Sequence, residues 1–401
     1  YSWYLQSPEY RILVKKLTEA SFSERPSDKI GKTVAKILYG EISPYSATRL
    51  ERFAACAFAH FLQYGLKVTE RAEYEFRAMD MGNVMHMALE KFAAEVRKEG
   101  LDWAELTEEE RNRIIDSCLD QVSADYGNTV LKSSARNEYM IERTRRILRR
   151  TVWALQEQLK HGAFRPEGFE VRFQGGRIDR VDIMEEPENN RVYVKVIDYK
   201  TGNTSFDLLA LYHGLQLQLM VYLDGALQVE KRKYPDREIV PAGVFYYNVK
   251  DPMIQEKIHA DMESINEQML KKMKMNGLVQ ADDNMSTKID STMASIPVSL
   301  NRDGSFSKRS SVASRKQFDA LGAYVRRKIC DVRESILDGN AAVEPYELGK
   351  KNACTYCPYL TVCGFDRKIP GYEFHRLSSI EEDTLWKKIM KGEEENGSEM
   401  D

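Results

Sequence analysis

Apolar positions in the first 160 residues recur mainly at helical spacing. Ser46 offers a side-chain N-cap shortly before RLERFAACAFAHFLQYG, so the sequence predicts a helix there that contains Cys56. A second amphipathic helix is predicted near 80–98, in DMGNVMHMALEKFAAEVRK. The interval 104–160 is also helical in pattern, and Thr107 followed by three glutamates marks a helix start within it. This part of the chain is therefore predicted to be helical.

The pattern changes after residue 162. GFEVRFQGGRIDRVDIM and RVYVKVIDYKTG alternate at period two and flank EEPENN, which has strong turn composition, so they predict a β-hairpin. A helix is predicted at 207–229 and a further strand at 240–248. Strands that alternate with helices indicate the α/β class: a mixed sheet flanked by helices, with a large helical insertion at 104–160.

The remaining segments lack such regular patterns. Residues 1–45 contain spaced prolines and are predicted to be a linker or the remnant of an upstream domain, followed by a main domain over 46–370. Residues 276–315 are rich in Ser, Asn, Asp and Gly, which predicts a long surface excursion. Residues 371–401 are predicted to be an acidic tail that ends in a disordered stretch. Because the chain opens at Tyr1 with what looks like mid-domain sequence, we expect it to come from a longer protein.

Composition restricts the function classes. With 42% hydrophobic and 30% charged residues, the chain has a globular composition, and no apolar run is long enough to span a membrane. Neither is there a signal peptide, so we expect a cytoplasmic protein. The net charge of -3 neither supports nor excludes binding of DNA. Six cysteines without a secretory signal leave metal binding or buried thiols as the alternatives.

Two carboxylates and a lysine are predicted to converge in the hairpin. If EEPENN is the turn, its midpoint lies near position 188, and Asp179 and Asp198 then face one another within a residue. Opposed residues of an antiparallel pair have Cβ atoms about 5 Å apart, which suits two carboxylates that share a divalent cation such as Mg²⁺ or Mn²⁺. Lys200 follows on the same face and can offset charge on a scissile phosphate.

The alternative is that these are ordinary solvated residues of a hairpin. Against it, Asp198 and Lys200 follow the apolar run VYVKVI, and three neighbouring basic residues, Arg177, Arg180 and Lys195, are expected to bind phosphate. We therefore favour a phosphodiesterase site.

The successive motifs GRIDRVD, IDYKTG and QLQLMVYLDGAL resemble those of RecB-type nucleases in the PD-(D/E)xK superfamily, whose fold is a restriction-endonuclease-like mixed sheet. The resemblance implies that His86, within GNVMHMALE, completes the metal site, and that Gln218 and Tyr222 help to hold the site and the DNA. The predicted catalytic residues are therefore Asp179, Asp198, Lys200, His86, Gln218 and Tyr222, with metal ligation at His86, Asp179, Asp198 and Tyr199.

Several of these assignments have alternatives. A lone helical histidine is more often a satisfied core residue, and Tyr222 fits the apolar face of its helix. Gln216 competes with Gln218 for the glutamine of the motif. Glu170, in FEVRF, is a weaker, outer member of the site.

Three cysteines, Cys354, Cys357 and Cys363, form C-x2-C-x5-C, a clustering that indicates a metal site. A motif that begins with C-x2-C usually indicates a zinc site. A fourth ligand must come from elsewhere, and Cys56, Cys118, Cys330 and His60 are the candidates.

YSATRLERFAACAFAHFLQYGL and NACTYCPYLTVC together resemble the two halves of the iron-sulfur staple in the AddB subunits of bacterial AddAB helicase-nucleases. The resemblance runs from about Tyr45 to about Asp366. It implies a [4Fe-4S] cluster on Cys56, Cys354, Cys357 and Cys363 that joins the two ends of the domain in a structural role. One departure is Ala57, where the family commonly has proline. Cys118 and Cys330 are then expected to be buried small hydrophobes.

The function expected from this resemblance is a Mg²⁺-dependent nuclease domain that hydrolyses single-stranded DNA during helicase-coupled processing of double-strand breaks. An AddA-like helicase-nuclease subunit is the expected partner, in a heterodimer. Two alternatives remain: a free-standing iron-sulfur exonuclease of the RecB superfamily, and a catalytically silent DNA-binding or scaffolding module.

Overall fold

The computed structural model describes residues 2–22, 29–40, 46–71, 78–126, 134–254, 261–369 and 371–397. The chain divides into two compact units, each of which combines segments distant in the sequence. Unit 1 comprises Tyr1–Arg71, Leu209–Leu215 and Arg327–Glu381, and unit 2 comprises Ala72–Leu208, Gln216–Arg326 and Glu382–Asp401. None of the described helices is both long and apolar enough to cross a membrane.

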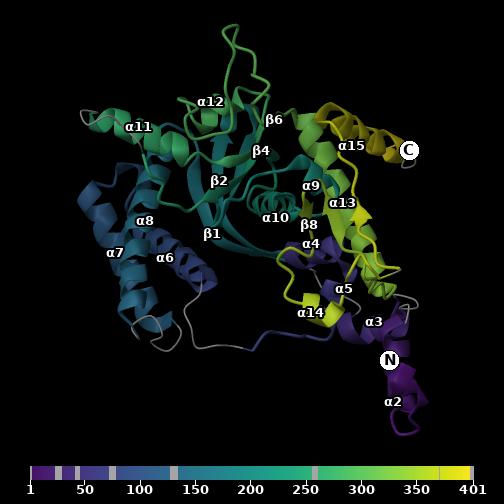
Figure 1. The fold of residues 1–401 in the computed structure, drawn as a ribbon. Helices are drawn as coiled ribbons and strands as arrows, with labels where there is room; N and C mark the ends of the chain where they lie inside the picture. Colours follow the sequence, from purple (N-terminus) through teal and green to yellow (C-terminus); the bar gives the residue numbers. More distant parts are fainter. Residues whose placement is uncertain are drawn as a thin grey trace. The chain divides into compact units, whose positions relative to one another are not determined.

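Unit 2 is built on a six-stranded mixed sheet in the order β1-β2-β3-β4-β5-β6 (Figure 1). The strands are β1 Arg165–Phe173, β2 Gly176–Glu186, β3 Arg191–Lys200, β4 Glu238–Asn248, β5 Asn276–Gln280 and β6 Val312–Ala313. Pairing is parallel between β3 and β4 and between β5 and β6, and antiparallel elsewhere. This sheet and its helices confirm the predicted α/β class.

The predicted hairpin is confirmed as β2 and β3, joined by the short 3-10 helix η4 Pro187–Asn189. Arg180 pairs with Ile197, and each step along β2 is matched by one step back along β3. Continuing this register by one residue places Asp179 opposite Asp198. The turn composition therefore located the opposed carboxylates correctly.

Helices cover the two faces of this sheet. Helix α10 Gln218–Lys233 packs across β1 to β4 on one face, as Figure 1 shows. The other face contributes Tyr193, Ile197 and Tyr199 to a large core shared with three helices. These are α6 Ala78–Lys98, α7 Glu108–Asp125 and α8 Ala135–Lys160, and α7 begins with the capping box at Thr107 that the sequence predicts. Because side chains alternate along β3, Asp198 and Lys200 lie on the α10 face.

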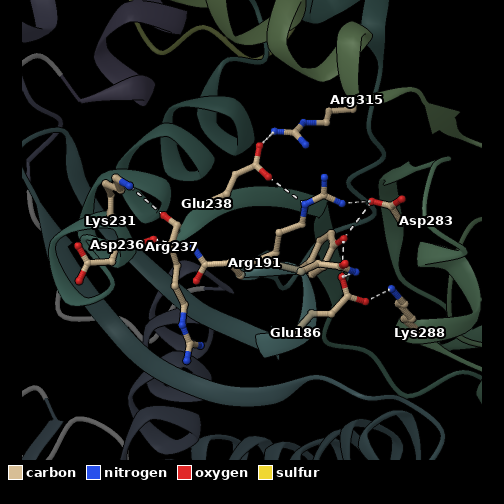
Figure 2. A network of polar contacts seen from close by, with 12 residues as sticks. Glu186, Arg191, Lys231, Asp236, Arg237, Glu238, Asp283, Lys288 and Arg315 are labelled. Atoms are coloured by element: carbon tan, nitrogen blue, oxygen red, sulfur yellow. Dashed lines mark hydrogen bonds and ion pairs between the residues drawn. The ribbon is translucent and has the colours of Figure 1, made fainter.

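A network of ion pairs closes the end of the sheet where β3 begins (Figure 2). Arg191 binds Glu238 at 2.9 Å and Asp283 at 3.4 Å, and Glu238 is also paired with Arg315. Lys288 binds Glu186 at 2.9 Å. The charges in this network largely compensate one another, which indicates a structural role. It lies at the opposite end of β3 from Lys200, about 30 Å away at the rise of a strand.

Unit 1 contains α4 Ala47–Ala55, α5 Ala57–His60, the π-helix η1 Phe61–Gly65 and α14 Leu360–Cys363. A three-stranded sheet has the order β8-β7-β9, from Lys351–Asn352, Tyr346–Leu348 and His375–Arg376. The N-terminal segment predicted as a linker or remnant contains α1 Ser2–Gln6, α2 Arg11–Phe22 and α3 Lys32–Tyr39. Ser46 caps α4 as predicted, accepting a hydrogen bond from the Arg49 backbone N–H.

Two predicted helices are interrupted in the structure. The first breaks at Cys56, whose backbone is extended between α4 and α5. The second, predicted over 207–229, divides into α9 Leu208–Tyr212 and α10. Gly214, with φ of +79°, ends the first of these pieces in a left-handed conformation that favours glycine. Both predictions of a single continuous helix are therefore wrong.

The polar segment 276–315 is more structured than the sequence predicts. It contains β5, β6 and helix α12 Met285–Ile289, and Val279, Met285 and Ile296 are fully buried. Asp290 accepts hydrogen bonds from Thr292 and Ser295, so the polar residues satisfy the turns locally.

The segment 371–401 also contains regular structure, namely helix α15 Glu382–Gly397, connected to α13 Arg315–Leu337 through the cysteine region. Its residues Leu385, Trp386 and Ile389 are buried. Residues 398–401 of the predicted tail lie outside the described residues. The buried apolar positions show that much of this segment is part of the fold.

Candidate active site

Three adjacent strands each bring one carboxylate to the same level of the sheet. Asp179 on β2 faces Asp198 on β3, and the register between β1 and β2, with Phe169 paired to Arg180 and Val171 to Ile178, places Glu170 opposite Asp179. The Tyr199 backbone N–H donates to Asp179 Oδ2 at 2.8 Å, which fixes one carboxylate.

Burial and mutual repulsion disfavour the ionised forms of these carboxylates unless a positive charge lies nearby. Desolvation raises the pKa of both Asp179 and Asp198, and the charge of Asp179 raises the pKa of Asp198 further. Desolvation and the neighbouring Asp179 also raise the pKa of Glu170 to about 7. Asp198 is only 2% exposed. A divalent cation would offset these charges, because hard cations take carboxylate oxygens as ligands.

A ring nitrogen of His86 lies beside the carboxylates, where it could bind a metal. Its Nδ1 lies 3.3 Å from Asp179 Oδ2, and ligand atoms of His86, Glu170 and Asp179 all lie within 4.8 Å of one another. Burial lowers the pKa of His86, which favours the neutral ring that binds metals. The structure thus brings the predicted histidine to the site and gives Glu170 a more central position than the sequence suggested.

Gly82 explains how α6 approaches the end of β3. It lies one helical turn before His86, and a Cβ added at Gly82 would lie 3.1 Å from Thr201 Oγ1. A larger side chain would push the helix away from the strand. Gly82, four residues before His86 in GNVMH, is therefore a spacing residue.

Lys200 is held by partners from β3 and α10. Its Nζ lies 2.6 Å from Asp198 Oδ2 and donates to Gln218 Oε1 at 2.7 Å. Gln218 Nε2 in turn donates to the Tyr222 hydroxyl at 2.8 Å. The competing Gln216 instead bonds the Ser205 carbonyl and the Asp207 N–H. Of the two glutamines, Gln218 is the one that contacts the site.

The side chain of Tyr199 lies on the other face of the sheet. Its phenol is buried near Arg180 and Tyr247, and burial raises its pKa to about 12. Only the main chain of Tyr199 borders the carboxylates, through the N–H bound to Asp179 and a backbone hydrogen bond with His86. Any metal ligation at this position would therefore involve the backbone.

The prediction that Arg180 and Lys195 bind phosphate is wrong. Both are buried on the face opposite Asp198, where Arg180 Nε lies 2.6 Å and Lys195 Nζ 2.9 Å from the carboxylate of Asp182. Period-two alternation separates these residues from the site, so their proximity in the sequence was misleading. Arg177, whose side chain is 56% exposed, pairs with Glu170 and remains at the site.

The four cysteines of the predicted cluster line one small cavity in unit 1. Cys56, Cys354, Cys357 and Cys363 surround it together with apolar residues that include Phe58, Val343 and Leu360. None of the six cysteines forms a disulfide. The break between α4 and α5 places Cys56 there. The sequence could not show this, because AACAFAH has a continuous helical pattern.

The environment of these sulfurs fits a metal cluster. The Phe365 N–H donates to Cys363 Sγ at 3.3 Å, and Arg52 donates to Cys357 Sγ at 3.8 Å. Burial and the other three sulfurs raise the pKa of Cys354 to about 11. Four thiolates therefore need a compensating positive charge, and N–H donors to sulfur are typical of iron-sulfur sites.

The other ligand candidates are located elsewhere. His60 is buried among Tyr39, Phe53 and Tyr64 and accepts a hydrogen bond from Arg49 Nε at 3.2 Å. Cys118 is buried in α7, as predicted, whereas Cys330 is exposed, contrary to the prediction. Cys56 is therefore the best-placed fourth ligand.

Comparison with known proteins places the chain in a family. Residues 44–364 match the PD-(D/E)XK nuclease superfamily, and the chain belongs to this superfamily. It is 40% identical over 405 residues to the B subunit of the ATP-dependent helicase/deoxyribonuclease of Lachnoclostridium phytofermentans, covering 96% of this chain and 35% of that protein. The corresponding protein of Alkaliphilus metalliredigens is 35% identical over 417 residues, covering 98% and 36%. That of Thermoanaerobacter sp. (strain X514) is 33% identical over 425 residues, covering 100% and 37%.

The chain thus spans about a third of the length of these curated relatives. The predicted class of enzyme, a nuclease, is confirmed by membership of this superfamily.

Proposed function

We propose that the chain is the Mg²⁺-dependent nuclease domain of an AddB-like subunit and hydrolyses phosphodiester bonds of single-stranded DNA. The observation that carries this proposal is the grouping of Glu170 and Asp179 with His86, beside Asp198 on the next strand, with Lys200 on the same face as Asp198. Buried like charges are costly unless they hold a cation.

Asp179, Asp198, Glu170 and His86 would hold the divalent cation, with the backbone of Tyr199 bordering it. When bound, the cation supplies positive charge beside the phosphate and lowers the pKa of water. Lys200 contributes a second positive charge at a position fixed by Asp198 and Gln218, where it can stabilise the charge that develops on the phosphate.

The cysteine site would hold a [4Fe-4S] cluster with a structural role. Cys56 is distant in the sequence from Cys354, Cys357 and Cys363, so a shared cluster would cross-link both ends of unit 1 and restrict the unfolded chain. The donors to two of the sulfurs support the cluster rather than a set of free thiols.

The relatives' description as part of a helicase/deoxyribonuclease supports a helicase-coupled role. We propose an AddA-like helicase-nuclease subunit as the heterodimeric partner, with DNA unwound at double-strand breaks as the substrate. The length of the relatives favours this role over a free-standing exonuclease. A silent scaffolding module would not need Lys200 held between Asp198 and Gln218.

The test is cleavage of end-labelled single-stranded DNA by anaerobically purified protein in Mg²⁺. Lys200→Ala and Asp198→Ala should each lower the rate at least a hundredfold, as loss of electrostatic or metal-holding groups does. Lys91→Ala is the matched control, because Lys91 is partly exposed on α6 and donates to Gln121 Oε1 of α7 rather than to a site residue. Equal rates for Lys200→Ala and the control, or no cleavage by wild type with an intact cluster, would support the scaffolding alternative.

A further inference from the structure

A cleft lies at the C-terminal ends of the parallel strands β3 and β4. It has a volume of about 490 Å³, and α6, α8 and the residues after the two strands form its walls. Its lining includes Met81, Gly82, Arg136, Arg143, Thr201 and Lys250. Clefts of this size hold ligands as large as a nucleotide, and ligands of α/β sheets commonly bind beyond the carboxyl ends of strands.

Three basic residues of this cleft differ from neighbouring arginines in forming no ion pair with any acidic residue that the structure describes; the acidic residue that lines the cleft, Asp251, is bound to Arg146 and Arg150. Helix α8 contains further arginines at 145, 146, 149 and 150, and each is paired with an acidic residue. Arg145 and Arg149 bind Asp116, and Arg146 and Arg150 bind Asp251. Within the described part of the chain, Arg136, Arg143 and Lys250 form no ion pair.

The two unpaired arginines share one helical face. Arg136 and Arg143 lie seven residues apart, which is two turns of α8. Met140 lies between them and, with Met81 of α6, gives the cleft an apolar wall. An ordinary solvated face would not combine unpaired cations with apolar walls in a concave site. This combination suits a sugar-phosphate backbone.

Residues of the cleft are close neighbours of active-site residues along β3 and α6. Thr201 directly follows Lys200, and Gly82 lies one turn of α6, about 5.4 Å, from His86. A Cβ added at Gly82 would lie 3.1 Å from Thr201 Oγ1, so α6 and the end of β3 meet at the wall of the cleft nearest to His86 and Lys200. A strand whose phosphate lies at the carboxylates would therefore place a neighbouring phosphate in the cleft.

We propose that Arg136, Arg143 and Lys250 bind a backbone phosphate of the single-stranded DNA next to the scissile one. This inference rests on the proposed nuclease function and adds a binding subsite contributed by the helical insertion. The bond is an ionic contact with phosphate oxygens, so it carries no base specificity.

The test is the salt dependence of binding, which does not require cleavage. Fluorescence anisotropy of a labelled oligothymidine is measured in EDTA over a series of salt concentrations. Arg143→Ala should weaken binding severalfold and reduce the slope of log K against log salt by about 0.7, the value for one phosphate contact on a single strand. Arg136→Ala and Lys250→Ala should have the same direction of effect.

Arg149→Ala is the control, because it removes the same charge from the same helix, where Arg149 is bound to Asp116. Its slope should equal that of wild type. Equal slopes for Arg143→Ala and Arg149→Ala, or no binding by wild type, would overturn the subsite. Cleavage by wild type in Mg²⁺ separates the two proposals. If wild type cleaves and the salt slopes of the three variants equal that of wild type, only the subsite is refuted. If the variants reduce the slope but wild type does not cleave, only the nuclease function is refuted.

Discussion

Replacing Asp198 with asparagine should stabilise the metal-free protein. Burial and Asp179 raise the pKa of Asp198 from 3.8 to about 6, so the folded state opposes its ionisation. Each unit by which the pKa is higher in the folded state costs about 1.4 kcal/mol of stability when the group is ionised. Ionised Asp198 therefore destabilises the folded protein by at most roughly 3 kcal/mol at neutral pH. Asparagine cannot form the ion pair with Lys200 and is still a buried polar group, and both effects reduce the gain. We therefore expect the free energy of unfolding to rise by about 1–3 kcal/mol.

The gain should depend on pH in a defined direction. Asp198 is harder to ionise in the folded than in the unfolded chain, so its cost grows as pH rises from about 4 to about 6 and is complete above that. The advantage of Asp198→Asn should therefore be full at pH 8 and shrink towards pH 4. Urea unfolding in EDTA, followed by circular dichroism, measures both values.

The same substitution should remove the stabilisation that Mg²⁺ gives to wild type, because binding to the folded state alone raises stability. Wild type should thus gain stability from Mg²⁺ while Asp198→Asn should not. A loss of stability in EDTA at pH 8, or an undiminished Mg²⁺ effect in the variant, would refute this reasoning.

Three further outcomes are expected. Asp182→Ala should lower the free energy of unfolding in urea by about 3–5 kcal/mol, because it leaves the buried Arg180 and Lys195 without their ion-pair partner. The control Asp120→Ala removes an exposed ion pair and should cost about 1 kcal/mol or less in the same assay. Cys56→Ser should lower the iron and sulfide content of anaerobically purified protein, measured against Cys330→Ser, which should retain wild-type content. Gly82→Val should displace α6 and weaken Mn²⁺ binding in calorimetry at least tenfold, with a retained far-ultraviolet spectrum as proof of folding.

The site could be predicted from the sequence where local geometry determines it. The turn at EEPENN and the period of two were enough to place Asp179 opposite Asp198 and Lys200 on the same face. The same argument applied to the turn at Gln174 and Gly175 mirrors Glu170 onto Asp179, so the central position of Glu170 was also within reach. The positive φ of Glu170, +50°, could not be predicted from the sequence.

Other features depend on contacts between distant segments. The break of the helix at Cys56 accompanies its position at the cavity that the other three cysteines line, and no local pattern marks it. Similarly, Arg180 and Lys195 read as surface cations until the face of the sheet on which they lie and their shared partner Asp182 are known. Composition gave a wrong prediction for 276–315. Polar residues dominate this segment, but they form hydrogen bonds with one another, and the apolar residues among them are buried.

The most direct measurement is calorimetric titration of Mn²⁺ into metal-free protein, with wild type compared with Asp179→Asn and with Asp120→Asn as a surface control. If the converging carboxylates and His86 form a metal site, wild type and the control bind the ion and Asp179→Asn loses at least tenfold in affinity. Equal affinity in all three proteins would show that the cation is not held by these carboxylates and would contradict the assignment of the active site.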